Sequence, residues 1–258
     1  MLAAQRRQRI LDEVRRVGGV RVSELTTLLG VSDMTVRRDL DRLSQEGLVS
    51  KVHGGATTPQ SASVEPGFEV KSRRQLAEKH ALAEAAAMLV QPGQAVALGA
   101  GTTTWLLAQH LQAVEGLTVV TNSVKVADVL RPCCDVVLTG GVRTPSDALV
   151  GPVADLVLRS LHFDVAFLGC HGMSAAGLST PNLAEAATNR AFVRAAARVV
   201  VVADSTKWGT AGLMTWAELS EVDVLITDRG LDLDAQRLLQ SQVGRLHVVQ
   251  PQAQRVAR

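Results

Sequence analysis

The stretch VSDMTVRRDLDRL, from Val31 to Leu43, decides how the N-terminal part of this chain folds. Ser32 is a favourable N-cap residue, because its hydroxyl accepts a hydrogen bond from a free amide of the first helical turn. Val36, Leu40 and Leu43 recur at the spacing that places side chains on one buried face of a helix. The stretch therefore predicts a short helix that packs an apolar face against neighbouring elements.

The other faces of this predicted helix carry groups that suit the major groove of DNA. Met34, Arg38 and Asp41 point away from the apolar face, and Thr35 and Arg37 flank it. Arginine donates hydrogen bonds to guanine edges and phosphates, and the threonine methyl contacts thymine. The alternative for this stretch alone is an ordinary amphipathic helix with solvated arginines.

The segments on either side favour DNA binding. Residues 6–17 predict a helix, and Ser23 is expected to cap a second helix that stops at Gly30. Two helices joined by a three-residue turn that starts with glycine form a helix-turn-helix, whose second helix reads the bases. Residues 48–56 alternate around a Gly-Gly pair and predict a two-stranded wing that faces the DNA backbone or minor groove. The candidate DNA-binding residues are Ser32, Met34, Thr35, Arg37, Arg38, Lys51 and His53.

Charge is distributed unevenly along the chain. The first 57 residues hold ten basic and seven acidic residues, and the rest holds 17 of the 27 basic and 18 of the 25 acidic residues. The basic excess lies where a helix-turn-helix would meet phosphates.

The three cysteines make no even-numbered disulfide framework, no apolar run reaches membrane-spanning length, and no charged-then-apolar leader is present. We therefore expect a reduced, cytoplasmic protein with no membrane partner.

The second part of the chain reads as a larger α/β domain. Residues 58–70 are expected to form a linker, since the segment is rich in Ser, Pro and Gly; this places a winged helix-turn-helix domain at 1–57 and an α/β domain at 71–258. A long helix is expected over residues 71–90. Short apolar runs then alternate with helical segments, which indicates a mostly parallel sheet covered on both faces. The runs are 95–98, 117–121, 135–139, 165–168, 199–203, 222–227 and 246–249.

Polar or glycine-rich turns follow five of these runs. Ligands of open α/β sheets bind beyond the carboxyl ends of the strands, so the turns are expected to meet at one edge. In LGAGTTT, residues 98–104, backbone amides and threonine hydroxyls before a helical segment suit an anion. Lys207 is a candidate to neutralise a phosphate, and Asp147, His171 and Glu185 are candidates to bind sugar hydroxyls. Alternatively, these residues serve only as turn, capping or surface residues. The candidate effector-binding residues are Gly99, Gly101, Thr102, Thr103, Thr104, Thr121, Asn122, Ser123, Gly140, Gly141, Asp147, His171, Gly172, Glu185 and Lys207.

Other chemistries have weaker support. The dinucleotide-binding fingerprint and the P-loop are absent, and no spacing of His and Cys suits a metal, so neither a cofactor nor a metal is expected. The enzymatic alternative is a phosphosugar isomerase with an accessory DNA-binding domain, in which Glu185 acts as base and Lys207 as electrophile. A redox switch at Cys133 and Cys134 rests on little beyond the presence of these two residues.

Taken together, the chain resembles the DeoR family of bacterial transcriptional regulators. The motifs that carry the likeness, between Arg6 and about Asp228, are VSDMTVRRDL, KVHGGA, LGAGTTT, VVTNS, LTGG, ALVGP, GLST, the pair Glu185-Ala186 and VVVADSTKWG. The resemblance implies a winged helix-turn-helix followed by a sensor domain similar to phosphosugar isomerases and CoA transferases. It implies that the chain has no catalytic residues and that its ligands are operator DNA and a phosphorylated sugar or related metabolite. It also implies a homodimer or homotetramer.

The same resemblance places the anion-binding turn of the family at Gly101 to Thr104 and its lysine at Lys207. The chain departs from the family in the motif GCHG, where His171 stands at a position that is often acidic. This departure argues against isomerase-like acid–base chemistry and points to a different ligand. We therefore expect a regulator of sugar metabolism genes, most often a repressor in this family, rather than an enzyme.

Overall fold

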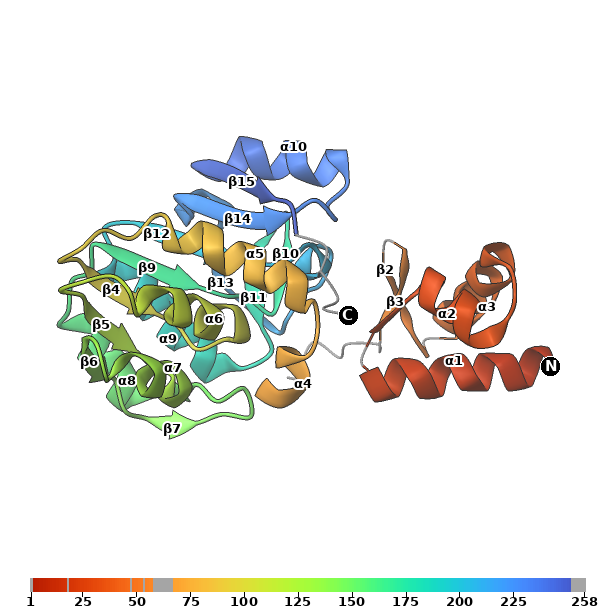
Figure 1. Ribbon diagram of the computed structural model, residues 1–258, viewed down its shortest axis with the longest axis horizontal. Helices are drawn as coiled ribbons and strands as arrows, with labels where there is room; N and C mark the ends of the chain where they lie inside the picture. The colour runs from red at the N-terminus through yellow and green to blue at the C-terminus, as the bar shows by residue number, and fades with distance from the viewer. Residues whose placement is uncertain (1, 18, 47, 53, 58–66, 252–258) are drawn as a thin grey trace. The chain divides into compact units, whose positions relative to one another are not determined.

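The chain divides into two compact units, residues 1–61 and 62–258 (Figure 1). The computed structural model describes residues 2–17, 19–46, 48–52, 54–57 and 67–251. Each unit has its own hydrophobic core.

The first unit contains three helices and a small antiparallel sheet. The elements are α1 (Ala3–Val17), β1 (Gly19–Arg21), α2 (Val22–Leu29), α3 (Asp33–Gln45), β2 (Ser50–Val52) and β3 (Gly55–Thr57). The predicted helices and the β2–β3 wing are present, and β1 adds a third strand in the order β1-β3-β2. β1 has no sequence signal because it is three residues long and starts with glycine. A Cβ at Gly55 would lie 2.1 Å from the Val20 carbonyl oxygen, so only glycine allows β1 and β3 to pair.

The expectation that Ser23 caps the second helix is wrong. Because β1 ends at Arg21, α2 begins at the next residue, and the Arg21 amide donates to Glu24 Oε2 at 2.9 Å. Ser23 lies within the first turn, where its carbonyl accepts from the hydroxyls of Thr26 and Thr27. α2 ends at Gly30 as expected, with a left-handed φ of 66° that suits glycine.

A buried ion pair ties α1 to α3. Asp39 is only 5% exposed, although its neighbours Arg37 and Arg38 in α3 face solvent. Arg6 Nη2 donates to Asp39 Oδ1 at 3.3 Å, and Arg7 Nη1 lies 3.9 Å from the same oxygen. A buried carboxylate needs such partners, because desolvation of an unpaired charge is costly. Asp39 therefore helps to fix the orientation of α3 against α1.

Seven parallel strands form the central sheet of the second unit, in the order β15-β14-β12-β9-β4-β5-β6 (Figure 1). All seven predicted runs lie in it, so the prediction of an α/β domain with a mostly parallel sheet is confirmed. The strands are β4 (Ala95–Leu98), β5 (Thr118–Thr121), β6 (Asp135–Leu138), β9 (Val165–Leu168), β12 (Val199–Val202), β14 (Val224–Asp228) and β15 (Arg245–Val249).

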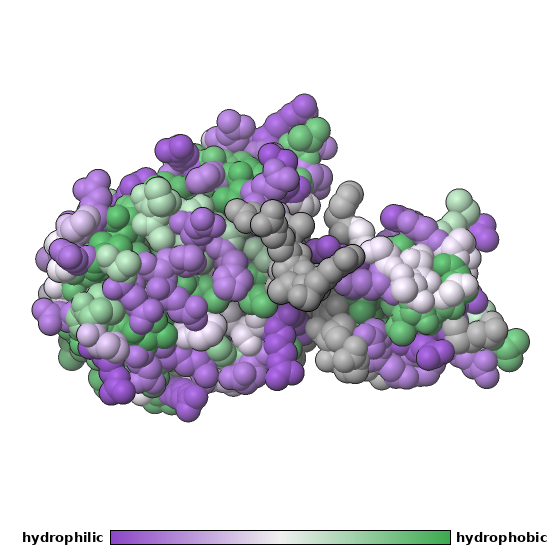
Figure 2. Space-filling model, in the orientation of Figure 1, coloured by the Kyte–Doolittle hydropathy of each residue, from purple (hydrophilic) through white to green (hydrophobic). Residues whose placement is uncertain are grey.

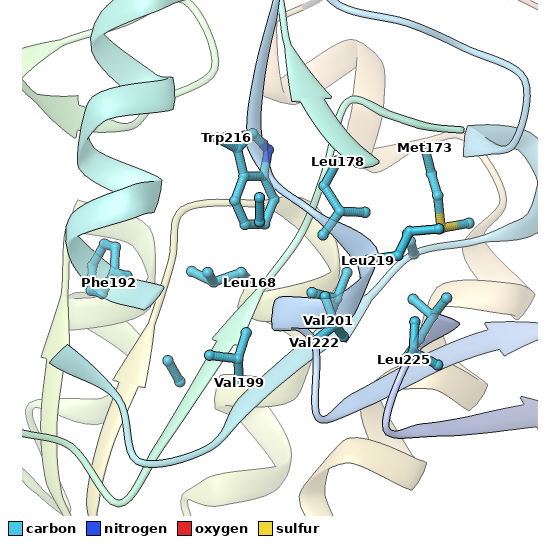
Figure 3. Packing of buried hydrophobic residues seen from close by; sticks show 14 of the residues in the cluster. Leu168, Met173, Leu178, Phe192, Val199, Val201, Trp216, Leu219, Val222 and Leu225 are labelled. Carbon is cyan, nitrogen blue, oxygen red and sulfur yellow. The ribbon is translucent and has the colours of Figure 1, made fainter. Parts of the chain in front are cut away.

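Both faces of the central strands β4, β9 and β12 are buried. Along β12, Val199 and Val201 pack into one core and Val200 and Val202 into the other, because side chains alternate across a strand. α5 (Leu76–Ala87), α6 (Thr102–Leu111) and α7 (Val124–Leu130) cover one face. The other face packs against α8 (Pro152–Arg159), α9 (Leu183–Ala195) and α10 (Leu233–Gln242). Figure 3 shows this second core, with Trp216 and Phe192 near Leu168.

Two small sheets and two single-turn helices have no counterpart in the sequence analysis. β10 (Gly172–Ser174), β11 (Gly177–Thr180) and β13 (Met214–Ala217) form an antiparallel sheet, and β7 (Val142–Arg143) pairs with β8 (Leu149–Val150). The single-turn helices are η1 (Ser205–Lys207) and η2 (Leu219–Glu221). Strands of two to four residues carry too little periodicity to stand out from loops.

The single helix expected over residues 71–90 is wrong. Two helices occupy this region, α4 (Phe68–Ser72) and α5, and α4 begins inside the segment for which a linker was expected. They separate at Gln75, which has a left-handed φ of 49°. This conformation costs a non-glycine residue about 1–2 kcal/mol. The turn places the Lys71 carbonyl so that it accepts a hydrogen bond from Lys79 Nζ, which a continuous helix would prevent.

Hydrophilic residues are spread over the visible faces of both units, with smaller apolar areas between them (Figure 2). Among the described residues, no helix has the length and apolar character needed to span a membrane.

Candidate functional site

The start of α3 has the geometry that the sequence predicts. Ser32 Oγ accepts from the Thr35 amide at 3.4 Å and lies 2.9 Å from Thr35 Oγ1. Val36, Leu40 and Leu43 are buried, whereas the Met34 side chain is 70% exposed. The buried face of α3 therefore packs against the protein, and its outer face is exposed to solvent.

The two adjacent arginines of α3 differ in their surroundings. Arg37 is held along the helix by Asp33, with Arg37 Nη2 donating to Asp33 Oδ2 at 3.4 Å. Arg38 is exposed, and no hydrogen bond or ion pair involves its side chain within the described part of the chain. Arg38 is therefore free to contact a new partner without breaking a described ion pair, whereas Arg37 would have to leave Asp33.

The candidate residues of the wing are only partly described. Lys51, on β2, forms an ion pair with Asp41 of α3, and both side chains are half-exposed. This pair links the wing to α3 and reduces the charge that Lys51 presents to solvent. His53 lies outside the described residues.

In the second unit, the five predicted turns lie at one edge of the sheet, because they follow the carboxyl ends of parallel strands. The first of them leads from Gly99 into α6. Gly101 is the N-cap residue and supplies no side-chain cap, so the first amides of α6 point into this edge without one. Thr102 and Thr103 are buried there, and Thr104 Oγ1 donates to the Gly99 carbonyl at 2.6 Å.

The turn after β5 holds neighbouring loops in place. Asn122 Oδ1 accepts from the Ala100 amide at 2.7 Å, and Asn122 Nδ2 donates to the Leu149 carbonyl at 3.0 Å. Thr121 Oγ1 donates to the Leu98 carbonyl at 2.7 Å, and Ser123 Oγ accepts from the Val126 amide as the N-cap of α7. The polar groups of this turn therefore position the loop that precedes α6.

Three glycines of the candidate set act through their backbone. Gly140 and Gly141 have φ values of 73° and 116°, and a Cβ on Gly141 would lie 2.5 Å from the Val150 carbonyl oxygen. A Cβ on Gly172 would lie 2.2 Å from the carbonyl oxygen of Thr210. Gly141 and Gly172 allow two backbones to approach closely, and Gly140 accommodates a positive φ that favours glycine.

The two candidate carboxylates already have protein partners. Asp147 pairs with Arg143 at 2.7 Å and with Lys125 at 3.7 Å. Glu185 is 8% exposed, and its carboxylate accepts from the hydroxyls of three residues. These donors are Thr144, at 2.7 Å, Ser146, and Thr180, at 3.2 Å. Three hydroxyl donors already occupy this carboxylate, which argues against Glu185 as the catalytic base of the isomerase alternative.

His171 and Lys207 lie on adjacent segments. The Met173–Trp208 bridge and the hydrogen bond from the Gly209 amide to the Met173 carbonyl join the two segments. Burial lowers the pKa of His171 to about 4, with contributions from Lys207 and Lys71, so the imidazole is neutral at pH 7. His171 Nε2 is buried and has no hydrogen-bond partner in the described structure.

Three basic residues that the sequence analysis did not select join Lys207 at this edge. Lys79, in the first turn of α5, is 4% exposed, and burial lowers its pKa to about 8. The fields of Lys207, Lys71 and Arg74 also lower this pKa, whereas Asp204 raises it. The sequence EKHALAEAAA predicts an ordinary helix, in which a lysine is expected to face solvent. Only the α4–α5 turn, which periodicity does not predict, brings these side chains together.

The surroundings of Cys134 and Cys170 disfavour the thiolate form of both residues. Burial and the neighbouring Cys133 thiol raise the pKa of Cys134 to about 11, and burial raises the pKa of Cys170 to about 12. Both groups therefore remain thiols at pH 7, and the thiolate is the reactive form. In the described part of the chain, no group of three or more His, Cys, Asp or Glu residues is arranged to hold a metal ion.

Two family models match the chain. The model of the DeoR-like helix-turn-helix domain matches residues 6–62, and that of the DeoR C-terminal sensor domain matches residues 74–229. The chain belongs to the DeoR family. The family assignment that the motifs predicted is therefore confirmed, and so is the expectation of a DNA-binding regulator rather than an enzyme.

Named relatives that match this DeoR-family chain over nearly their whole length are transcriptional regulators. An uncharacterised transcriptional regulator, YgbI of Escherichia coli K12, is 42% identical and covers 94% of this chain and 96% of its own. A putative aga operon transcriptional repressor of Escherichia coli O157:H7 is 36% identical, over 90% of this chain and 88% of its own. The lactose phosphotransferase system repressor of Streptococcus mutans is 34% identical, over 92% and 97%.

Among solved structures, a D-ribose-5-phosphate isomerase in complex with phospho-erythronic acid matches half of this DeoR-family chain. It covers 50% of this chain and 52% of its own, with 16% identity and a TM-score of 0.39. A likeness at this level carries no argument about function.

Proposed function

We propose that this DeoR-family protein represses genes of sugar metabolism by binding operator DNA through α3, under the control of a phosphorylated sugar. The observation that carries the proposal is the exposed, N-capped face of α3, where Arg38, near Met34 and Thr35, has no side-chain partner among the described residues. A helix with donors and a methyl group near its N-terminus suits the major groove. The relatives that are named as repressors of the aga operon and of the lactose phosphotransferase system support control of sugar genes.

The effector is proposed to bind at the carboxyl edge of the seven-stranded sheet. The first amides of α6 suit the phosphate, because a helix N-terminus carries partial positive charge and free donors. At the same edge, His171 follows β9, the neighbour of β4 in the sheet, and Lys207 lies in η1 after β12. Thr102 and Thr103 add hydroxyl groups there. Asn122, Thr104, Gly141 and Glu185 are proposed to hold the site in shape rather than to contact the ligand.

Helix α4 is proposed to transmit effector binding, since it is the first described element after the DNA-binding unit. Phe68 of α4 packs edge-to-face on Trp105 of α6, with ring centroids 6.1 Å apart. Lys125 Nζ lies 4.7 Å from the centroid of the Phe68 ring and 3.3 Å from Glu69 Oε1. A ligand held by the start of α6 therefore acts next to the surface on which α4 docks. A coupling free energy of about 1–3 kcal/mol is enough to change operator occupancy.

Replacing Phe68 with alanine is expected to uncouple the two ligands. The effector should still bind with a dissociation constant within about threefold of the wild type, whereas its effect on DNA affinity should fall from about 5- to 150-fold to less than twofold. The measurement is operator affinity with and without the effector, with effector affinity determined by calorimetry. Val70→Ala, an exposed change on the same helix, is the control. Full effector control in Phe68→Ala would contradict the role of α4.

The protein is proposed to act as a homodimer or homotetramer. Two copies place two α3 helices on half-sites about 34 Å apart, one turn of the DNA helix. β6 is an edge strand of the sheet, and Val137 and Leu138 on it are exposed. Val142 on β7 and Leu156 on α8 are also exposed. Exposed apolar side chains beside an unpaired strand edge suit association with a second copy.

Footprinting on the promoter of the protein's own gene tests the proposal. The full chain should protect two half-sites, and one member of a panel of sugar phosphates should change the protein concentration at half-protection. Light scattering on the same sample gives the number of copies per particle. Absence of protection at every effector concentration would refute a regulator of that promoter.

A further inference from the structure

Basic side chains gather where α4 and α5 meet the segment that follows β12, beside the proposed effector site. Lys71 of α4, Arg74 of the α4–α5 turn and Lys79 of α5 converge with Lys207 of η1, and their charges act on one another. The Lys71 carbonyl accepts from both the Arg74 amide, at 3.2 Å, and Lys79 Nζ. The strained turn at Gln75 thus folds the chain around the buried Lys79 ammonium.

Within the described residues, Arg74, Lys79 and Lys207 carry more positive charge than the carboxylate beside them offsets. Asp204 is the one carboxylate whose field raises the pKa of Lys79 among the described residues, and it also accepts from the amide and hydroxyl of Thr206. Asp228, the next carboxylate along this edge, is engaged by Ser205 and by the Gly230 amide. Arg74 Nε is buried without a hydrogen-bond partner in the described structure. Buried charge without a partner is costly, so an anion bound here offsets that cost.

The cluster and the start of α6 are separate positions. The proposed phosphate site follows β4 and Lys207 follows β12, with β9 between them in the sheet. Neighbouring strands lie about 4.8 Å apart, so the two strand ends are separated by about 10 Å. A single phosphate does not span this distance, whereas a short sugar chain with an anionic group at each end does. Arg74, His171 and Lys207 are partly exposed, so a ligand reaches them from solvent.

We propose that the effector carries two anionic groups, a phosphate at the start of α6 and a carboxylate or second phosphate bound by Arg74, Lys79 and Lys207. This inference rests on the proposed function of the sheet edge as the effector site. It narrows the effector from any phosphorylated sugar to phosphorylated sugar acids and sugar bisphosphates. His171, neutral at pH 7, lies between the two positions and donates to or accepts from a sugar hydroxyl.

Matched ligands separate the possible sources of the second charge. Glucitol 6-phosphate has one anionic group, 6-phosphogluconate adds a carboxylate, and glucitol 1,6-bisphosphate adds a phosphate to a chain of the same length. Glycerol 3-phosphate and 3-phosphoglycerate form a shorter pair. Titration calorimetry with the full chain at pH 7 should show at least one doubly anionic ligand binding about 10-fold or more tightly than its singly anionic partner, the effect of one charge-assisted contact.

Two variants in the same turn test the assignment. Arg74→Gln should reduce the preference for the doubly anionic ligand to about threefold or less and leave the singly anionic ligand within about twofold of the wild type. Arg73→Gln removes the same charge from an exposed neighbour and should retain the full preference. Equal loss of all ligands in Arg74→Gln would overturn the proposal.

The outcomes also distinguish this inference from the proposed function. Equal binding of singly and doubly anionic ligands would overturn the two-anion effector and leave a sugar phosphate effector in place. Absence of binding by every phosphorylated ligand would overturn both.

Discussion

Replacing Arg38 with alanine is expected to weaken binding to the specific operator by about 1–3 kcal/mol, or about 5- to 150-fold, and to relax the preference for one base pair. The structure gives two reasons for a large effect. Arg38 is exposed on α3 and has no side-chain partner within the described residues, so no internal pair competes with the DNA. Arg37 is held by Asp33 and does not take over the contact without breaking that pair.

Lys51→Ala provides the contrast to Arg38→Ala. A wing lysine contacts phosphate, so its loss should weaken all DNA sequences alike and make the dependence on salt less steep. The effect should be smaller than for Arg38, because Lys51 already pairs with Asp41. Affinities for operator and for scrambled DNA, measured over a range of salt concentrations, separate the two roles.

Arg42→Ala is the matched control for charge, because Arg42 lies near the end of α3 and pairs with Glu46 at 2.8 Å. It should change specific binding by less than about 0.5 kcal/mol, as surface substitutions generally do. The same loss of affinity in Arg38→Ala for operator and scrambled DNA would show that Arg38 contacts phosphate rather than a base.

Replacing Lys79 with methionine is expected to stabilise the protein without effector at pH 7 and to reduce its stabilisation by the effector. Burial lowers the pKa of Lys79 to about 8 from 10.5, so the charged form is disfavoured in the folded state. At about 1.4 kcal/mol per pKa unit, this corresponds to about 3 kcal/mol as an upper limit. Loss of the hydrogen bond to the Lys71 carbonyl subtracts about 1 kcal/mol. The net gain of about 1–2 kcal/mol corresponds to about 2–8 °C in the midpoint of thermal unfolding.

The pH dependence supplies a second readout for Lys79. Below pH 8 the lysine is protonated in both states, and between pH 8 and 10.5 the unfolded state binds more protons. The wild type should therefore gain stability as pH rises through this window, and Lys79→Met should lack this gain. Effector affinity of the wild type should fall above pH 8, because the free protein loses the ammonium that binds the anion.

Thermal unfolding of wild type, Lys79→Met and the exposed control Arg73→Met, at pH 7 and pH 9.5 with and without effector, measures these effects. A purely structural lysine predicts the opposite sign, with Lys79→Met less stable than the wild type at both pH values. That result, or full stabilisation of the variant by the effector, would show that Lys79 does not belong to the site.

Local patterns were enough for much of the fold. Ser32 and the spacing of Val36, Leu40 and Leu43 predicted α3 correctly, because a cap and a buried helix face depend on residues within two turns of each other. The seven apolar runs predicted the parallel sheet for a similar reason, since strands buried on both faces are continuous apolar segments. The motifs in fixed order identified the family, and the order of the strands placed the polar turns at one edge.

The sequence by itself therefore determined the two-part organisation, the elements of the α/β sheet, the outward face of α3 and the family, all of which follow from neighbours in the chain. Only the tertiary structure decided which polar groups have partners. Asp39 meets Arg6, Glu185 meets Thr144, and Lys79 lies among Arg74 and Lys207, each pair brought together by folding. Burial sets the cost of a charge and the availability of a donor, and burial arises from contacts between distant segments that no local pattern records.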